Sequence, residues 1–97
     1  MILHIKIYGR VQGVWFRSFV VKQASFYPSL HGWVRNRQNG CVEVLADGNT
    51  NDIEKLRKAC QKGPILARVD RIEPVTGIDA IVPPIDYSAP FTTEATC

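Results

Sequence analysis

The stretch HGWVRNRQNGCVEVLAD, residues 31 to 47, decides the fold of this 97-residue chain. Residues 31–36 and 41–47 predict two strands, in which successive side chains point to opposite faces. Between them, Asn39 and Gly40 tolerate the positive φ angles that a tight connection requires. The stretch therefore predicts a β-hairpin, and the rest of the chain must supply the elements that pack around it.

A strand and a helix precede the hairpin. Residues 2–8 alternate between apolar and polar side chains, as in a strand that packs on one face. Residues 15–27 place apolar side chains at spacings of three, four and seven, which predicts a helix with one stripe toward the sheet. Pro28 ends this helix, because proline cannot continue it.

A second helix and a last strand follow the hairpin. The helix is expected to begin after Asn51, whose side chain would cap it, and to end at Gly63 and Pro64. Residues 68–75 predict a strand that contains a β-bulge, because the apolar side chains there do not alternate. Along the sequence, one strand and one helix therefore precede the hairpin, and one helix and one strand follow it.

Taken in order, these elements predict an α+β fold of the ferredoxin-like, split βαβ type (βαββαβ). An antiparallel sheet would carry both helices on one face. Residues 76–97 add a loop and at most a short edge strand over residues 87–92, because their prolines disfavour a central strand. A chain of this length suits one small core, so we expect residues 1–97 to form a single domain.

Composition and charge bound the function classes. The net charge of +3 favours small anionic ligands but lacks the dense basic stripe of a duplex-binding protein. The first residues carry no long apolar run, so we expect a cytoplasmic protein with no membrane anchor. Three cysteines without a C-x-x-C pair argue against a disulfide framework and a zinc site, so no metal site is expected.

The segment GRVQGVWFR, residues 9 to 17, joins the first strand to the first helix and carries a candidate anion site. Glycines let such a turn curl until several backbone N–H groups converge on one point. The helix dipole favours a phosphate there, and Arg17 could hold two of its oxygens. The spacing fits neither the dinucleotide fingerprint nor the Walker loop. On these residues alone, an ordinary tight turn beside a solvated arginine is the alternative.

Asn36, at the end of the first hairpin strand, is the second candidate. Its amide offers both a donor and an acceptor, which suits it to orient a water molecule or to brace the turn through its own backbone. Around it, we expect Trp33 and Val34 to pack in the interior. Arg35 and Arg37 are expected to stay in solvent and add to the local positive potential.

These two stretches together resemble the acylphosphatase family, small enzymes that hydrolyse the carboxyl-phosphate bond of acyl phosphates. The family signature Gly-x-Val-Gln-Gly-Val-x-Phe/Tyr-Arg is met in full by residues 9–17. The second signature, Gly-aromatic-small apolar-x-Asn, three residues, Gly-x-Val, five residues, Gly, is met by residues 32–48. The likeness covers nearly all of residues 2–75, and it implies hydrolysis without metal, cofactor or covalent intermediate.

Carried over by position, the resemblance implies that Arg17 binds the phosphate and that Asn36 orients the attacking water. The backbone N–H groups it implies for the cradle are those of Gln12, Gly13, Val14, Trp15, Phe16 and Arg17. An acyl phosphate suits such a site, because its carboxylate leaving group has a pKa of about 4 and departs without an enzyme acid. The expected partners are a small acyl phosphate and inorganic phosphate, as product and inhibitor, with a monomeric protein and no nucleic acid.

Other functions compatible with the same fold are kept as alternatives. One is a ferredoxin-like nucleic-acid-binding module, although residues 41–47 lack the aromatics on which bases stack and carry Glu43 and Asp47. Another is a catalytically degenerate member of the family. A third is the acylphosphatase-like segment at the start of larger carbamoyl-transfer proteins.

Overall fold

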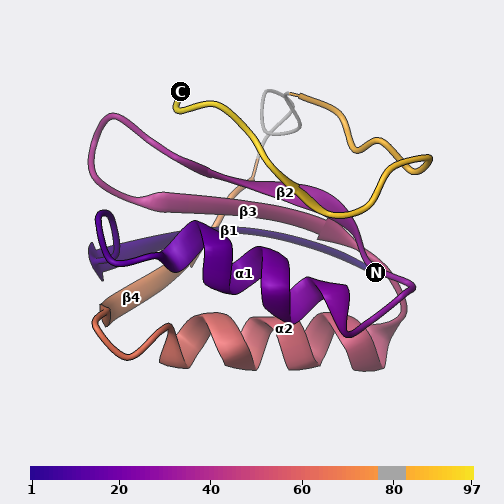
Figure 1. Ribbon diagram of the computed structural model, residues 1–97, viewed down its shortest axis with the longest axis horizontal. Helices are drawn as coiled ribbons and strands as arrows, with labels where there is room; N and C mark the ends of the chain where they lie inside the picture. The colour runs from indigo at the N-terminus through magenta and orange to yellow at the C-terminus, as the bar shows by residue number, and fades with distance from the viewer. Residues whose placement is uncertain (77–82) are drawn as a thin grey trace.

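The computed structural model describes residues 1–76 and 83–97, and Figure 1 shows the elements in the predicted order. The elements are β1 (Ile2–Arg10), α1 (Phe16–Ser25), β2 (His31–Asn36), β3 (Val42–Asp47), α2 (Thr50–Lys62), β4 (Arg68–Pro74) and β5 (Thr92–Thr93). The part of the predicted C-terminal loop at residues 77–82 lies outside the described residues.

The strands form one sheet in the order β4-β1-β3-β2-β5. The pairs β1–β3, β1–β4 and β2–β3 are antiparallel, as predicted, whereas β5 pairs with β2 in parallel. The α+β, ferredoxin-like fold is therefore confirmed, with a short parallel strand that makes the sheet mixed. β5 contains Thr92 and Thr93, so it begins at the last residue of the predicted edge strand, 87–92. The chain before Thr92 crosses the sheet and does not pair along it.

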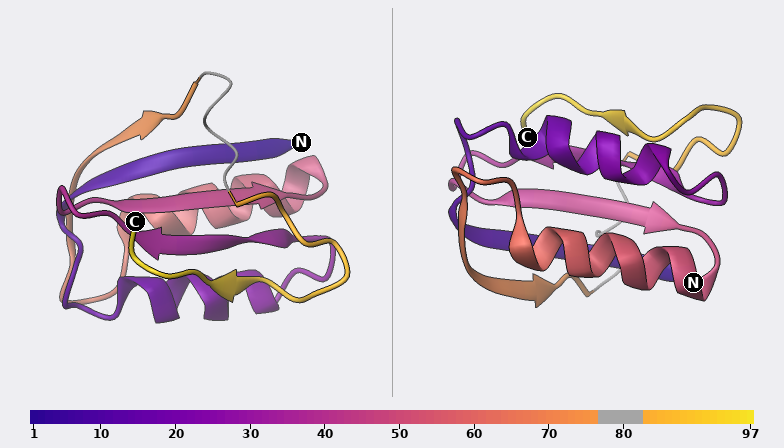
Figure 2. Two further views of the ribbon diagram at one scale, coloured as in Figure 1. Left: turned by 90° about the horizontal axis from the view of Figure 1, so that it is seen from above. Right: turned by 60° about the horizontal axis from the view of Figure 1, so that its bottom comes forward.

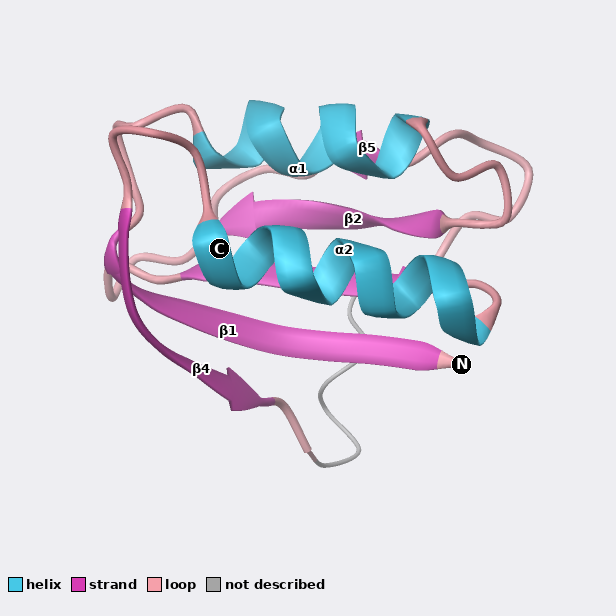
Figure 3. Cartoon of the chain, turned by 90° about the horizontal axis from the view of Figure 1, so that it is seen from below, coloured by secondary structure: helices cyan, strands magenta, loops and turns pink. Residues whose placement is uncertain are grey.

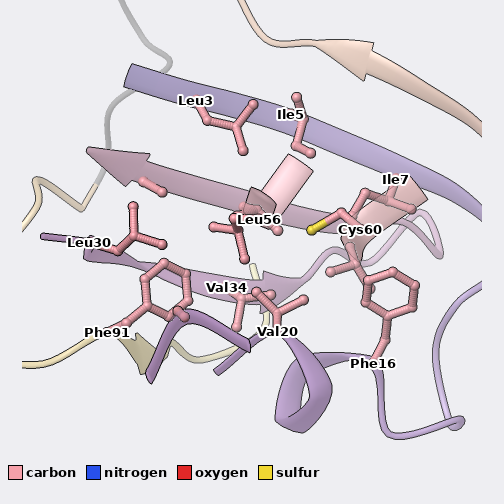
Figure 4. Packing of buried hydrophobic residues seen from close by; sticks show 14 of the residues in the cluster. Leu3, Ile5, Ile7, Phe16, Val20, Leu30, Val34, Leu56, Cys60 and Phe91 are labelled. Atoms are coloured by element: carbon pink, nitrogen blue, oxygen red, sulfur yellow. The ribbon is translucent and has the colours of Figure 1, made fainter. Parts of the chain in front are cut away.

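Both helices cover one face of the sheet (Figures 2 and 3), and the hydrophobic core lies between these layers. The alternation in β1 turns Leu3, Ile5 and Ile7 toward the helices, and the stripes of α1 and α2 meet them (Figure 4). Among the described residues, no helix is long and apolar enough to span a membrane. Further core side chains labelled in Figure 4 are Phe16, Val20, Leu30, Val34, Leu56, Cys60 and Phe91.

Helix α2 begins earlier than predicted. Asn49, and not Asn51, is its N-cap, and its side chain accepts a hydrogen bond from the Asp52 N–H at 2.9 Å. The Ser29 hydroxyl selects this start, because it accepts from the Asn49 N–H at 3.2 Å and donates to the Asp52 carboxylate at 2.7 Å. Asn51 therefore lies inside the first turn, while Gly63 ends the helix as predicted.

The predicted bulge occurs where β1 meets β4. Tyr8 pairs with Arg71 and Gly9 pairs with Val69, so the register shifts by one residue between them. Gly9 has a φ of +135°, and a Cβ there would lie 2.1 Å from the backbone oxygen of Arg68. Gly9 thus allows the close approach of two strands inside β1. This corrects the expectation from the sequence that Gly9 shapes the loop. The strand continues to Arg10, two residues beyond its predicted end.

The sheet face away from the helices is crossed by the C-terminal segment. The Trp33 indole N–H donates to the carbonyl of Pro83 at 2.8 Å, and His31 Nδ1 lies 3.1 Å from the carbonyl oxygen of Ala89. The Tyr87 hydroxyl donates to Asp47 at 2.6 Å. As a result, Trp33 is only 2% exposed although it points away from the helices.

A buried ion cluster lies on this same face and corrects the prediction that Arg35 is solvated. Its side chain is 9% exposed and donates to the carboxylate of Glu43 at 2.9 Å. Glu43 also lies 2.6 Å from His4 Nε2 and 3.2 Å from Arg37 Nη1, so Arg37 is engaged as well. Burial raises the pKa of Glu43, but the hydrogen bonds from His4 and Arg35 outweigh it and leave that pKa below its ordinary value.

Candidate anion-binding site

The link between β1 and α1 is shaped by two residues in the left-handed conformation. Gly13 has a φ of 74°, and Trp15, the N-cap of α1, has a φ of 67° and a ψ of 24°. Trp15 is the one non-glycine residue with a positive φ in the described chain. That conformation costs such a residue about 1–2 kcal/mol. Strain of this kind persists where the surroundings fix it, commonly at ligand-binding sites, and left-handed residues are typical of backbone anion nests.

The backbone N–H groups of this link are available to a ligand. Within residues 1–76 and 83–97, no N–H from residue 12 to residue 18 donates to a protein acceptor. The first turn of α1 carries no acidic residue, and the side chain of Trp15 makes no capping hydrogen bond. The positive end of the helix dipole adds to these donors, so the link offers an environment that favours an anion.

A cavity of about 410 Å³ opens beside this link. It brings together Arg17, from the first turn of α1, and Asn36, from the end of β2, which lie far apart in the sequence. Arg17 is the one charged side chain among the lining residues in the described structure. The lining consists of Val11, Gly13, Trp15, Phe16, Arg17, Ser18, Asn36 and Thr93.

The structure places some of the predicted site residues in the cavity lining and others outside it. Gly13, Trp15 and Phe16 line the cavity with the two side-chain candidates, but Gln12 and Val14 do not. Val14 is buried in the core, together with Val11 and Phe16, as the sequence predicts for packing residues: their exposures are 4%, 1% and 2%.

The side chain of Gln12 has a positioning contact that sequence reasoning missed. Its amide nitrogen donates to the carbonyls of Arg37, at 2.7 Å, and Cys41, at 2.9 Å. These two residues close the turn of the hairpin, because the Arg37 N–H also donates to the Cys41 carbonyl. Gln12 therefore ties the link to the hairpin directly beside Asn36. The sequence offered one signal for this contact, because Gln12 is a polar residue between Val11 and Val14, which are both buried.

The C-terminal segment completes the site from the far side of β2. Thr93 pairs with Val34 in parallel, and the Glu94 N–H donates to the Val34 carbonyl at 2.9 Å. The Cys97 N–H donates to the Asn36 carbonyl at 3.1 Å. These bonds hold the segment along the strand that ends at Asn36 and place Thr93 in the cavity lining. No motif in the sequence marks Thr93.

The site combines converging main-chain donors, one guanidinium and one carboxamide. Such a set can neutralise the oxygens of a dianion and orient a water molecule beside it. In the part of the chain that the structure describes, no three His, Cys, Asp or Glu side chains gather as a metal site would require. The chemistry that the main-chain donors, the guanidinium and the carboxamide support is binding and positioning of an anion.

Comparison with known proteins places these features in a family. A family model described as Acylphosphatase matches residues 3–80. The chain is 43% identical over 77 residues to an acylphosphatase of Methylococcus capsulatus, covering 79% of this chain and 76% of the relative. It is 46% identical over 79 residues to that of Rhodospirillum rubrum, covering 79% and 86%. The crystal structure of the Bacillus subtilis acylphosphatase superposes with a TM-score of 0.76 at 32% identity, covering 97% of this chain and 99% of that one.

Proposed function

Since this chain belongs to the acylphosphatase family and hydrolyses acyl phosphates, we propose that it does so in the cavity beside α1. The observation that carries this proposal is the convergence of Arg17 and Asn36 on one cavity, next to a strained loop with free N–H groups.

The phosphoryl group is bound by the loop and the guanidinium. Its oxygens accept hydrogen bonds from the N–H groups of residues 12–17, and the guanidinium of Arg17 holds two of them. These contacts strengthen as negative charge develops on the phosphoryl oxygens in the transition state. Because the donors are fixed before the substrate arrives, no reorganisation is needed at the moment of reaction.

The attacking water is oriented by Asn36. The amide accepts from and donates to the water in line with the bond that breaks. The water oxygen forms a bond to phosphorus, the bond from phosphorus to the carboxylate oxygen breaks, and the carboxylate leaves with the electron pair. Its pKa of about 4 means that no enzyme acid must protonate it, and the proton of the water passes to the phosphate. The products are a carboxylate and inorganic phosphate, with no covalent intermediate and no metal.

The location in the cytoplasm and the single domain are part of the same proposal. The three cysteines Cys41, Cys60 and Cys97 are free thiols, which supports a reducing compartment. One continuous hydrophobic core supports a single domain over residues 1–97.

The alternative of a nucleic-acid-binding module is not favoured. In domains of that type, exposed aromatics on the helix-free face of the sheet stack on bases. Here Pro83, Tyr87 and Ala89 contact that face over β2 and β3, and Trp33 is 2% exposed there. Tyr8, an aromatic of β1 on the same face, lies under the guanidinium of Arg71, 4.1 Å from its ring centroid. The aromatic rings of this face are therefore already engaged by other parts of the chain.

The experiment that tests the proposed mechanism is phosphate release from benzoyl phosphate. We expect turnover that is unchanged by a chelator and competitively inhibited by inorganic phosphate, because the product fits the same contacts as the transferred group. Activity that a chelator abolishes, or that phosphate does not inhibit, would contradict the proposed mechanism.

A further inference from the structure

The indole of Trp15 is exposed and lines the cavity in which we propose that the acyl phosphate binds. Trp15 is 76% exposed, more than Phe26 at 60% or Tyr87 at 57%, and it lines the cavity. The other aromatic of the motif, Phe16, is 2% exposed and fills the core. An indole that is mostly exposed gains little from burial in the core, so the packing of the domain does not account for its size.

The backbone fixes where this indole is presented. Trp15 is the N-cap of α1 in a left-handed conformation, between the donors of the link and Arg17. Among the described residues, it takes part in no aromatic pair and no cation–π contact. Its π-face is thus left to solvent or to a ligand.

The remainder of the cavity limits the acyl group further. Arg17 is the one charged residue in the lining within the described structure. In the proposed mechanism its guanidinium binds the phosphoryl group. Ser18 and Thr93 are small and neutral, so in the described structure a second carboxylate on the substrate meets no cation in the lining. An uncharged acyl group is therefore preferred, and the exposed ring favours one with a flat or extended apolar surface.

We propose that Trp15 is a specificity-determining residue that selects acyl phosphates with an uncharged aromatic acyl group over acetyl phosphate and over acyl phosphates that carry a second carboxylate. This inference rests on the proposed site. Stacking of the acyl group on the indole supplies the discrimination. An aromatic contact of this kind is worth about a threefold to tenfold difference in kcat/KM.

The test measures kcat/KM for benzoyl, acetyl and succinyl phosphate, together with the inhibition constant for inorganic phosphate. Trp15→Asn removes the ring but keeps a residue that tolerates the left-handed conformation. Trp15→Phe keeps an aromatic ring under the same backbone strain. Phe26→Ala removes an exposed aromatic at the end of α1, outside the cavity lining, and serves as the control.

We expect the ratio of kcat/KM for benzoyl over acetyl phosphate to fall about threefold to tenfold in Trp15→Asn and to stay within about twofold in Trp15→Phe and in the control. The preference against succinyl phosphate should persist in all variants, because it depends on the absence of a second cation. The inhibition constant for phosphate reports separately on the main-chain donors, so that a loss of phosphate binding in a variant is distinguished from a change in acyl preference.

Two results would overturn the inference. One is a benzoyl-to-acetyl ratio in Trp15→Asn equal to that of the wild type. The other is a fall in that ratio accompanied by an equal loss of phosphate inhibition, because the substitution would then act on the phosphate contacts. Failure of the proposed site has a different signature: the wild type would hydrolyse acyl phosphates without inhibition by phosphate, whatever the residue at position 15.

Discussion

Replacement of Glu43 by glutamine should destabilise the domain strongly. The carboxylate is 3% exposed and accepts from Arg35 at 2.9 Å and from Arg37 at 3.2 Å, with His4 at 2.6 Å. Glutamine preserves the shape but removes the charge that compensates the buried guanidinium of Arg35. It also replaces one of the two acceptor oxygens with an amide NH₂ group, which cannot accept.

The expected loss follows from this geometry. Removal of one partner from a buried ion pair costs about 3–5 kcal/mol, because the other charge stays buried without compensation. A domain of this size has a total stability of about 5–15 kcal/mol, and 1 kcal/mol corresponds to about 4–8 °C in Tm. The melting temperature should therefore fall by more than about 12 °C.

The assays are thermal unfolding, which gives Tm, and urea unfolding, which gives the free energy, both followed by tryptophan fluorescence, with Glu54→Gln as the matched control. Glu54 pairs with Arg57 at 2.7 Å, but both side chains are more than a third exposed, at 37% and 36%. Exposed pairs of this kind are worth about 0–1 kcal/mol, so the control should lose little. Equal losses in the two variants would refute the reasoning that burial makes the Glu43 cluster costly to break.

The pH dependence of stability has a defined sign. The pKa of Glu43 lies below its ordinary value of 4.5, so the ionised form is favoured in the folded state. Its contribution is complete above pH 4.5 and is lost as the pH falls through the lowered folded pKa. Denaturation curves of the wild type should show this loss at acidic pH, and Glu43→Gln should show a smaller one.

The remaining predictions concern the site and the bulge. Arg17→Ala should lower kcat/KM for benzoyl phosphate at least about a hundredfold and abolish phosphate inhibition. Asn36→Ala should lower kcat with a milder effect on KM. Wild-type kinetics in either variant would remove that residue from the mechanism. Gln12→Ala should lower kcat/KM about tenfold to a hundredfold in the same assay, because the link loses its two bonds to the hairpin; an unchanged value would show that these bonds do not position the link. Gly9→Ala should cost at least about 2 kcal/mol in urea unfolding, because a Cβ there meets the β4 backbone, and Gly40→Ala, with no atom within 4 Å, should cost less; the reverse order would contradict the account of the bulge.

The sequence predicted the parts of the fold that depend on local periodicity. Alternation placed the core face of β1 correctly, and the apolar spacing of α2 placed Ile53 and Leu56 in the core. The cap of α2 was misplaced, because Asn49 and Asn51 both suit a cap. The choice between them depends on Ser29, which belongs to a distant part of the chain.

The burial of Arg35 was missed because the prediction considered only the strand on which Arg35 lies, without its partner strand. Arg35 and Glu43 stand directly opposite each other in the register of the hairpin, so a cross-strand reading of the same sequence contained the signal. What covers them could not be predicted, because the C-terminal segment crosses the sheet by contacts between residues far apart in sequence, such as that between Trp33 and Pro83. The same holds for Thr93 in the candidate site.

The most direct test of the account is a titration of the 15N-labelled protein with inorganic phosphate, followed residue by residue through its amide resonances. We predict saturable shifts that are largest for the amides of residues 12–17 and that disappear in Arg17→Ala. Shifts that are largest elsewhere on the protein, or no shifts at phosphate concentrations that inhibit hydrolysis, would contradict the claim that this loop binds the phosphoryl group.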